Sequence, residues 1–382
     1  MTEDPPTPSL SATTFVNPHR PPDAPGLAGA YASVPATAPS PLPSLPVDLD
    51  IEIVGAGTTM SLDDFLIRTD TTTFAVVVDG QVVYERYFLG TKSSDLLLGA
   101  SMSKSVLATL VGQAVTDGRL DIESTVTELV PELADSGYAA CRVRHLLTMT
   151  TGLAWQEDYR TPGGDGQRLL SSVAPGGEGS RNLLRSLRGD VPPDTRWRYC
   201  TPDSLALDWA RERATGEDHA TALANLWATL RCETDAIVGL DRSPDGGSAL
   251  AGIAVAATTR DWARLGMLQV DGGALLSPAW VRDSSAPSLP YTRPGLLPSD
   301  ITTHAGFGYH WWPLDDTGDL VMADGSRGQF TLVDRARRTV VVKTSAWPYD
   351  DWLVDRQNRD LSYLAMPVVA RVAAELAAPA GG

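Results

Sequence analysis

Two β-hairpins are predicted at opposite ends of the chain, and this separation constrains the fold more than any other feature of the sequence. Residues 74–78 and 81–87 are rich in β-branched and aromatic side chains and flank an Asp-Gly pair, which favours a tight turn between strands. Residues 328–333 and 339–344 form a second predicted pair of strands, preceded by another strand over 319–322. Because strands and helices pack in layers around one core, we expect both ends of the chain to share one antiparallel sheet.

The chain between the hairpins is predicted to be mostly helical. Helical patterns cover residues 103–117, 142–149, 180–188, 202–214, 218–230 and 259–271, and a last helix over 354–377 follows the second hairpin. This order predicts an α+β protein, in which an antiparallel sheet built from N- and C-terminal segments is flanked by helices and carries an inserted, mainly helical subdomain. We place the sheet subdomain at about 48–100 and 300–382, the helical subdomain at about 101–299, and the active site where they meet.

Residues 1–47 are expected to lie outside this domain of residues 48–382. They carry 12 of the 28 prolines, together with much alanine, serine and threonine, and they show no periodicity. Such a proline-rich segment is either disordered or an extended arm that lies on the body of the protein. We expect no chemistry from it.

The charge of the chain restricts its partners. A net charge of −16 and a pI near 4.7 argue against nucleic acids and anionic membranes, because both repel an acidic surface. The chain has no run of about 18 apolar residues, and its N-terminus has neither the basic start nor the apolar core of a secretory signal. We therefore expect a cytoplasmic protein that acts on a small molecule, and a homodimer is left open.

The cysteines and histidines predict neither a disulfide framework nor a metal centre. Cys141, Cys200 and Cys232 are odd in number and widely spaced, which favours reduced thiols in a cytoplasm. The five histidines form no pair at a metal-ligand spacing. The sequence therefore predicts no metal and no cofactor.

The most informative residues for chemistry are Ser101-Met102-Ser103-Lys104, where an apolar extended stretch meets the helix predicted over 103–117. Residues i and i+3 lie on one helical face, so Ser101 and Lys104 can touch. A serine hydroxyl needs a neighbour that takes its proton, and burial can lower the pKa of a lysine enough for that task. The N–H groups at a helix start also suit an oxyanion.

The same residues fit a simpler interpretation, a helix N-cap serine followed by a solvated lysine. Two observations favour function. The chain contains three lysines against 28 arginines, so a lysine at this position is an exception. A cation near a helix N-terminus is also electrostatically unfavourable.

A serine–lysine site needs further groups that move a proton to the leaving group and bind the oxyanion. Tyr199 precedes the helix predicted at 202–214 and is the candidate relay, with a pKa that the Lys104 ammonium could lower. Tyr199 equally fits an aromatic residue that packs at a helix start. Residues 324–326 are the candidate second oxyanion donor, and alone they are only a turn signal.

Several motifs together resemble the serine β-lactamase and D-alanyl-D-alanine-peptidase superfamily: SMSKS at 101–105, DGRLD at 117–121, VPEL at 130–133 and HLLTMTTG at 145–152. Others are similar to class C β-lactamases, to family VIII esterases and, more closely, to 6-aminohexanoate-dimer hydrolases: QEDY at 156–159, YC at 199–200, TTRD at 258–261, WW at 311–312, GQ at 328–329 and VKTSAWP at 342–348. The resemblance runs from about residue 70 to the C-terminus and implies a β-lactamase/DD-peptidase-like fold.

The resemblance implies roles for the matched residues. Ser101 would be the acylated nucleophile, Lys104 its base and Tyr199 the tyrosine of the second motif. The backbone N–H groups of Ser101 and Ser326 would form the oxyanion hole, and Gly325 would border the substrate.

Further residues are implied to face the substrate. Tyr159 matches a tyrosine that closes over the substrate amide in the nylon-oligomer enzymes, and Trp312 matches an aromatic wall of their pocket. Asp324 stands where β-lactamases carry a lysine that binds the substrate carboxylate, so it should repel β-lactams and D-Ala-D-Ala peptides. Arg327 could partly replace the lost cation. With Thr201 in place of an asparagine, these departures argue against β-lactamase function.

We therefore predict a serine hydrolase that cleaves an amide or ester bond of a small linear substrate through an acyl-enzyme on Ser101. Two alternatives remain open. The same site would support an acyltransferase, in which an amine or alcohol replaces water. The altered second and third motifs would also be compatible with a catalytically inactive binding protein.

Overall fold

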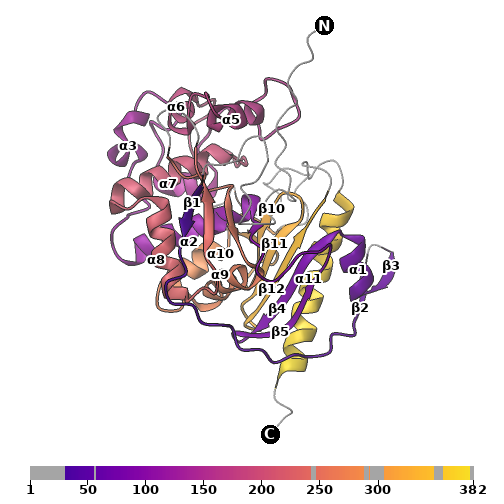
Figure 1. The fold of residues 1–382 in the computed structure, drawn as a ribbon. Coiled ribbons are helices and arrows are strands. Elements are labelled where there is room, and N and C mark those ends of the chain that lie inside the picture. The colour runs from indigo at the N-terminus through magenta and orange to yellow at the C-terminus, as the bar shows by residue number, and fades with distance from the viewer. Residues whose placement is uncertain are drawn as a thin grey trace.

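The computed structural model describes residues 31–55, 57–241, 247–287, 292, 305–347 and 356–378. Within them, one antiparallel sheet contains the strands β4 (Thr71–Val78), β5 (Gln81–Tyr87), β9 (Trp312–Pro313), β10 (Leu320–Gly325), β11 (Gln329–Asp334) and β12 (Thr339–Ser345). Their order is β5-β4-β12-β11-β10-β9 (Figure 1). The prediction that both ends of the chain share a sheet is confirmed, because β4 pairs with β12, with Val76 opposite Val341.

Alternate side chains of this sheet enter two different cores, as the pleat of a strand requires. Val340 and Val342 lie in the core on the side of α9 (Thr259–Asp271), whereas Val341 lies in the core on the side of α11 (Arg356–Ala377). Helix α9 is so close to the sheet that a Cβ on its Gly266 would fall 2.6 Å from Val340. Figure 1 shows α11, in yellow, against the sheet. Helices thus cover both faces, and the predicted α+β class is confirmed.

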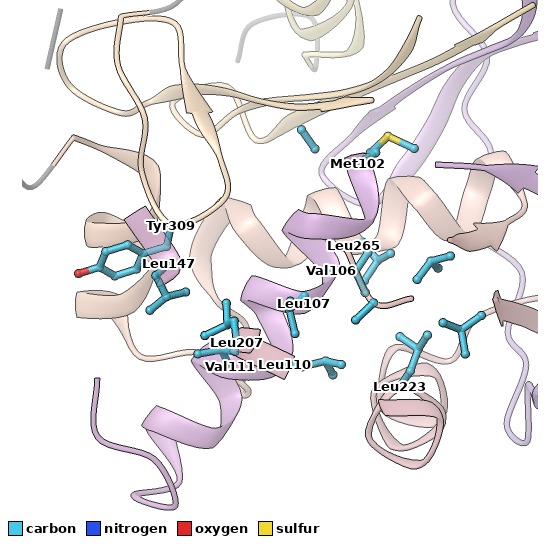
Figure 2. Packing of buried hydrophobic residues seen from close by; sticks show 14 of the residues in the cluster. Met102, Val106, Leu107, Leu110, Val111, Leu147, Leu207, Leu223, Leu265 and Tyr309 are labelled. Carbon is cyan, nitrogen blue, oxygen red and sulfur yellow. The ribbon is translucent and has the colours of Figure 1, made fainter. Parts of the chain in front are cut away.

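The helical part of the molecule surrounds α2 (Ser103–Thr116). Leu107 and Leu110 of this helix are buried in one cluster with Leu147, Leu207 and Leu223 from neighbouring helices (Figure 2). A helix that is apolar around its circumference must be buried on all sides, so α2 is held rigidly at the centre of this part. The surrounding helices are α3 (Val126–Leu129), α4 (Val143–Thr148), α5 (Asp165–Val173), α6 (Ser180–Ser186), α7 (Thr201–Thr215), α8 (His219–Leu230) and α10 (Pro278–Ser285).

A second sheet lies within the mainly helical part and was not predicted. Its order is β1-β7-β8-β6, from β1 (Tyr31–Val34), β6 (Leu97–Leu98), β7 (Ala236–Gly239) and β8 (Val255–Ala257). Strands of two to four residues are too short for alternation to identify them. A small hairpin of β2 (Glu52–Gly55) and β3 (Thr58–Ser61), followed by α1 (Leu62–Arg68), was likewise not predicted.

Residues 31–47 lie on the body in an extended conformation. Strand β1 pairs with β7, and further along the chain the N–H groups of Leu45 and Val47 donate to the carbonyls of Val82 and Val83, each at 2.9 Å. This segment therefore spans from the second sheet to the outer strand β5. The preceding residues 1–30 of the predicted arm lie outside the described residues, and the domain boundary at residue 47 stays a prediction.

None of the described helices is both long enough and apolar enough to cross a bilayer.

Candidate active site

Ser101 lies in a sharp turn that leads from β6 into α2. The turn is a short 3-10 helix, η2 (Ala100–Met102), and Ala100 has a left-handed φ of +47°, a strained conformation for a residue with a Cβ. The turn is pinned to β8, because Gly99 N donates to the Val255 carbonyl at 2.9 Å and Val255 N donates to Ser103 Oγ at 3.0 Å. The first N–H groups of such a helix have no intrahelical acceptor, so they are available to a ligand.

Lys104 is buried one turn after the serine, as predicted. Its Nζ lies 3.2 Å from Ser101 Oγ, 3.1 Å from Thr201 Oγ1 and 3.0 Å from the Gly252 carbonyl oxygen. Burial lowers the pKa of Lys104 to about 8, although the nearby Glu157 carboxylate opposes this shift. A lysine with this pKa is partly neutral near pH 7 and can accept a proton. The alternative of a solvated lysine is wrong, because the side chain is only 2% exposed.

Tyr199 joins this pair from the residues just before α7. Its ring centroid lies 5.2 Å from Lys104 Nζ. Burial raises the pKa of Tyr199, and the Glu157 charge adds to this effect, whereas the Ser101 side chain is near enough to act on this pKa and lowers it. The predicted lowering of this pKa by Lys104 is therefore wrong, because desolvation of the phenolate dominates. Tyr199 therefore stays protonated at neutral pH.

The predicted third motif meets the nucleophile turn at the end of β10. A Cβ built on Gly325 would fall 2.1 Å from the Gly99 carbonyl oxygen and 3.1 Å from Met102 N, so only glycine fits here. Ser326 follows in an exposed turn, and Arg327 is half-buried beside it with a left-handed φ of +63°. The structure thus brings the backbone around Ser326 next to the turn that carries Ser101.

Asp324 faces away from this contact, toward α11. Its Oδ2 accepts hydrogen bonds from Arg359 Nη2 at 2.7 Å and from the Tyr363 hydroxyl at 2.5 Å. Successive side chains of a strand point to opposite faces, which separates Asp324 from Gly325. Arg359 compensates the charge of Asp324, so this carboxylate is not a free charge, and the repulsion of β-lactams and D-Ala-D-Ala peptides stays a prediction.

The two predicted aromatic substrate residues both lie near Tyr199. The Trp312 ring is stacked on the Tyr199 ring, with centroids 6.0 Å apart and planes 12° apart. The Tyr159 hydroxyl donates to Glu157 Oε1 at 2.6 Å. Trp197 and Phe307 pack against Trp312 from behind, so an aromatic cluster forms one wall beside the serine.

Glu157 is a residue of this site that the sequence did not single out. Its carboxylate accepts hydrogen bonds from Trp155 Nε1 at 2.6 Å, from the Tyr159 hydroxyl at 2.6 Å, from Thr201 N at 3.0 Å and from the Thr201 hydroxyl. The QEDY stretch contained this glutamate, but no local pattern showed that Thr201, 44 residues later, would contact it.

His310 is a second residue that the sequence did not single out. Its ring nitrogens lie 3.3 Å from the Lys104 carbonyl oxygen and 3.2 Å from that of Leu146. Burial, reinforced by the Lys104 charge, lowers the pKa of His310 to about 3, so the ring is neutral. A neutral imidazole has a single N–H, so the ring donates to one of these two carbonyls and lies between α2 and α4, directly behind Lys104.

A metal centre was also sought among the described residues. They contain no group of three or more His, Cys, Asp or Glu side chains arranged to hold a metal ion.

Comparisons with known proteins show what the chain is similar to. The chain is 30% identical over 327 residues to the 6-aminohexanoate-dimer hydrolase of Paenarthrobacter ureafaciens, which covers 81% of each protein. A solved structure from Bacillus anthracis, described as a candidate 6-aminohexanoate-dimer hydrolase, superposes with a TM-score of 0.74 at 20% identity, over 90% of this chain and 91% of that one. The hydrolase EstCE1, described as having promiscuous acyltransferase activity, shares the fold with a TM-score of 0.57 at 16% identity, over 81% and 95% of the two chains.

The comparison with family profiles decides the relationship. Residues 66–364 match the Beta-lactamase family, and this span contains Ser101, Lys104 and Tyr199 together with both halves of the six-stranded sheet. The chain therefore belongs to the Beta-lactamase family, with a β-lactamase/DD-peptidase-like fold.

Proposed function

We propose that the protein is a serine hydrolase that cleaves an amide or ester bond of a small linear substrate through an acyl-enzyme on Ser101. The observation that carries this proposal is the contact of 3.2 Å between Ser101 Oγ and the buried amine of Lys104. A serine beside a base that is partly neutral near pH 7 is an activated nucleophile. The similarity to the 6-aminohexanoate-dimer hydrolase favours an amide.

In the proposed reaction the lowered pKa of Lys104 makes it the base, and the raised pKa of Tyr199 makes it the acid. Neutral Lys104 takes the proton of Ser101 as Oγ attacks the substrate carbonyl. Tyr199, kept protonated by burial, gives its proton to the leaving amine or alcohol, and Lys104 then returns a proton to Tyr199. Water then releases the acyl group: neutral Lys104 takes a proton from the attacking water, and a proton returns to Ser101 Oγ as its bond to the acyl carbon breaks.

We assign the oxyanion hole to the backbone N–H groups of Ser101 and Ser326. The first belongs to the start of a helix, and the second follows Gly325, which is packed against the Ser101 turn. Two N–H donors aimed at a developing oxyanion stabilise it without reorganisation.

We assign substrate binding to Tyr159, Trp312, Gly325 and Arg327. Trp312 offers an aromatic wall for the apolar part of a linear substrate, and Arg327 offers a cation close to the oxyanion hole. The substrate is a small molecule that binds without a cofactor. The free and buried state of Cys141, Cys200 and Cys232 supports a reducing compartment, which we take to be the cytoplasm.

The test is intact-protein mass spectrometry after incubation with short p-nitrophenyl acyl esters. We expect wild type to gain one acyl group and to release p-nitrophenol, and Ser101→Ala to do neither while it keeps its fold by circular dichroism. Ser171→Ala, at an exposed position of α5, controls for loss of a serine hydroxyl and should behave as wild type. Turnover by a folded Ser101→Ala protein would refute the proposal, and no adduct on wild type would favour an inactive binding homologue.

An acyltransferase is the second candidate, because the same acyl-enzyme can react with an amine or alcohol. The packed rings of Trp197, Tyr199, Phe307 and Trp312 limit the access of water on one side, which favours transfer over hydrolysis. Product analysis with added amines decides between them. Transfer products that increase with amine concentration would support an acyltransferase, and free acid at every amine concentration would exclude it.

A further inference from the structure

The three contacts of Lys104 restrict the direction in which the lone pair of its neutral amine can point. A neutral amine carries two N–H bonds and one lone pair. The Lys104 nitrogen has three neighbours, which are the Gly252 carbonyl oxygen, Thr201 Oγ1 and Ser101 Oγ. The Gly252 carbonyl can only accept a hydrogen bond. The lone pair therefore points either to Thr201 or to Ser101, and only the second arrangement makes Lys104 a base for the nucleophile.

The Thr201 hydroxyl decides between these arrangements, because it has a single proton. Thr201 is fully buried at the start of α7, and its hydroxyl donates to Glu157 Oε1. An ionised carboxylate only accepts hydrogen bonds, so the proton of Thr201 must point to Glu157. The oxygen of Thr201 then presents its lone pairs to Lys104 and accepts an N–H from it.

We propose that Glu157 is a positioning residue for Lys104, which acts through the hydroxyl of Thr201 and aims the lysine lone pair at Ser101. This inference rests on the proposed function, since it assigns Lys104 as the base. Glu157 does not contact the reacting atoms. It holds the proton of Thr201, and the two N–H bonds of the neutral lysine are then occupied by Thr201 and by Gly252.

The loop that carries Glu157 is built to hold this carboxylate in place. Arg198 Nη1 donates to the Trp155 carbonyl at 2.9 Å, which ties the loop to the chain before Tyr199. The four donors to Glu157 come from three residues, Trp155, Tyr159 and Thr201. The same carboxylate therefore joins the residue that touches the base, Thr201, to Tyr159, which we assign to the substrate.

The charge of Glu157 also stabilises the ammonium form of Lys104, which is produced when the lysine takes the proton of Ser101. The ionisable groups that face Lys104 are Glu157, Tyr199 and Cys200 on one side and His310 behind it. Burial keeps the tyrosine, the thiol and the histidine neutral at neutral pH. Glu157 thus raises the pKa of Lys104 against the effect of burial.

The decisive experiment compares Thr201→Val with Thr201→Ser in the full-length protein, with the rate of Ser101 acylation by a p-nitrophenyl ester as the readout. Valine has the shape of threonine without the hydroxyl, and serine keeps the hydroxyl. We expect Thr201→Val to acylate about 10²-fold more slowly, the scale of a misdirected general base, and Thr201→Ser to restore most of the rate. Equal rates for both variants, with unchanged melting temperatures, would overturn the proposal.

Glu157→Gln adds a readout that a merely structural role would not change. Removal of the charge lowers the pKa of Lys104, so the rise of the acylation rate with pH should move to lower pH while the maximal rate falls. Glu375→Gln, which removes an exposed charge at the end of α11, is the matched control and should leave the profile unchanged. An unshifted profile in folded Glu157→Gln would contradict the proposal, and if this variant does not fold, the Thr201 pair still decides. Absence of an adduct on wild type would instead refute the proposed function itself.

Discussion

At the scale of single residues, burial favours the neutral forms of both Lys104 and Tyr199 and therefore shifts their pKa values in opposite directions. Removal from water disfavours the ammonium form of Lys104 and the phenolate form of Tyr199. The pKa of Lys104 therefore falls to about 8, and that of Tyr199 rises. One environment thus produces a base and an acid side by side, which is the requirement for cleavage of an amide or ester near neutral pH.

This assignment predicts how acylation depends on pH. Only neutral Lys104 accepts the serine proton, and its neutral fraction increases as pH rises through about 8. We expect the burst rate of p-nitrophenol release to increase tenfold per pH unit well below that value and to level off above it. Stopped-flow measurement from pH 6 to 9.5, corrected with Ser101→Ala for spontaneous hydrolysis, checks this. A rate that is constant or falls over this range would contradict a base role for Lys104.

The sequence predicted Ser101 and Lys104 because their spacing is local. A separation of three residues at a helix start brings them together whatever the rest of the chain does. Glu157 and His310 could not be found in this way. Their contacts with Thr201 and Lys104 span 44 and 206 residues, and glutamate or histidine alone carries no signal of such a contact.

At the scale of elements, the junction of β10 with the η2 turn determines whether the oxyanion hole that we propose can form. Gly325 lies against the Gly99 carbonyl and Met102 N, so the strand end and the nucleophile turn are in direct backbone contact. The strand predicted over 319–322 covered only the first part of β10 (Leu320–Gly325), and the family resemblance, not the strand pattern, implied that its end lies near Ser101. The same alternation that turns Gly325 toward η2 turns Asp324 toward Arg359 on α11, which a sequence motif alone could not show.

A methyl group at this junction should separate the two oxyanion donors. We expect Gly325→Ala to lose about 1–3 kcal/mol of stability through overpacking and to acylate about 10²-fold more slowly through loss of one donor. Gly189→Ala is the matched control, because its Cβ would meet its nearest atom at 3.5 Å, an ordinary contact. Urea unfolding and burst kinetics measure both effects, and a Gly325→Ala protein with the wild-type burst rate would exclude this geometry.

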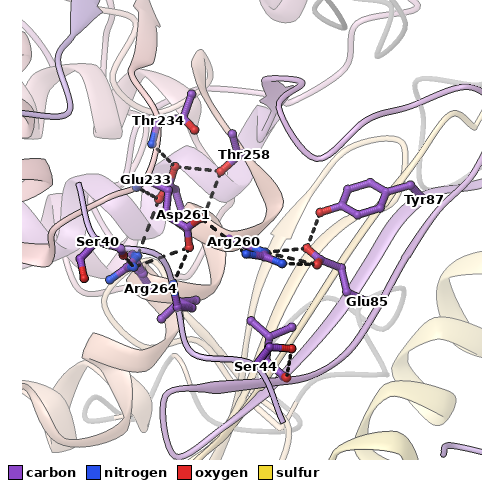
Figure 3. A network of polar contacts seen from close by, with 12 residues as sticks. Ser40, Ser44, Glu85, Tyr87, Glu233, Thr234, Thr258, Arg260, Asp261 and Arg264 are labelled. Atoms are coloured by element: carbon purple, nitrogen blue, oxygen red, sulfur yellow. Dashed lines mark hydrogen bonds and ion pairs between the residues drawn. The ribbon is translucent and has the colours of Figure 1, made fainter. Parts of the chain in front are cut away.

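At the scale of the whole molecule, residues 31–47 connect the helical part to the six-stranded sheet. Figure 3 shows where this segment is held: Arg264 contacts the Ser40 carbonyl and lies 3.6 Å from Glu233, and Arg260 bridges Glu233 to Glu85 on β5. Beyond it, Val82 N donates to the Pro43 carbonyl at 2.8 Å. The segment thus covers the free edge of β5, and an uncovered strand edge is a site for pairing with another chain.

Removal of this segment should both destabilise and expose the sheet. We expect a chain without residues 1–47 to lose at least about 2 kcal/mol of unfolding free energy, from several backbone hydrogen bonds at about 1 kcal/mol each, and to form larger oligomers at high concentration. A chain without residues 1–30 is the control, because it keeps β1 and the contacts with β5. Urea unfolding and light scattering compare them, and identical results for the two truncations would show that residues 31–47 have no such role.

The sequence by itself determined the α+β class, the two hairpins, the serine–lysine pair and the helices α2, α4, α6, α7, α8, α9 and α11, because each depends on residues that are close in the chain; α1, α3, α5 and α10 were not predicted. Alternation, helical periodicity, turn residues and an i, i+3 spacing all act within one element. The short strands of the second sheet lie below the length at which such patterns are visible.

Tertiary structure alone decided how these parts become a site. It placed Glu157 on Thr201 and His310 behind Lys104, and it paired Asp324 with Arg359. Each of these contacts joins segments that are distant in the sequence, so none leaves a local pattern. The pKa shifts of Lys104 and Tyr199 also depend on tertiary structure, because they follow from burial, which only the packed molecule produces.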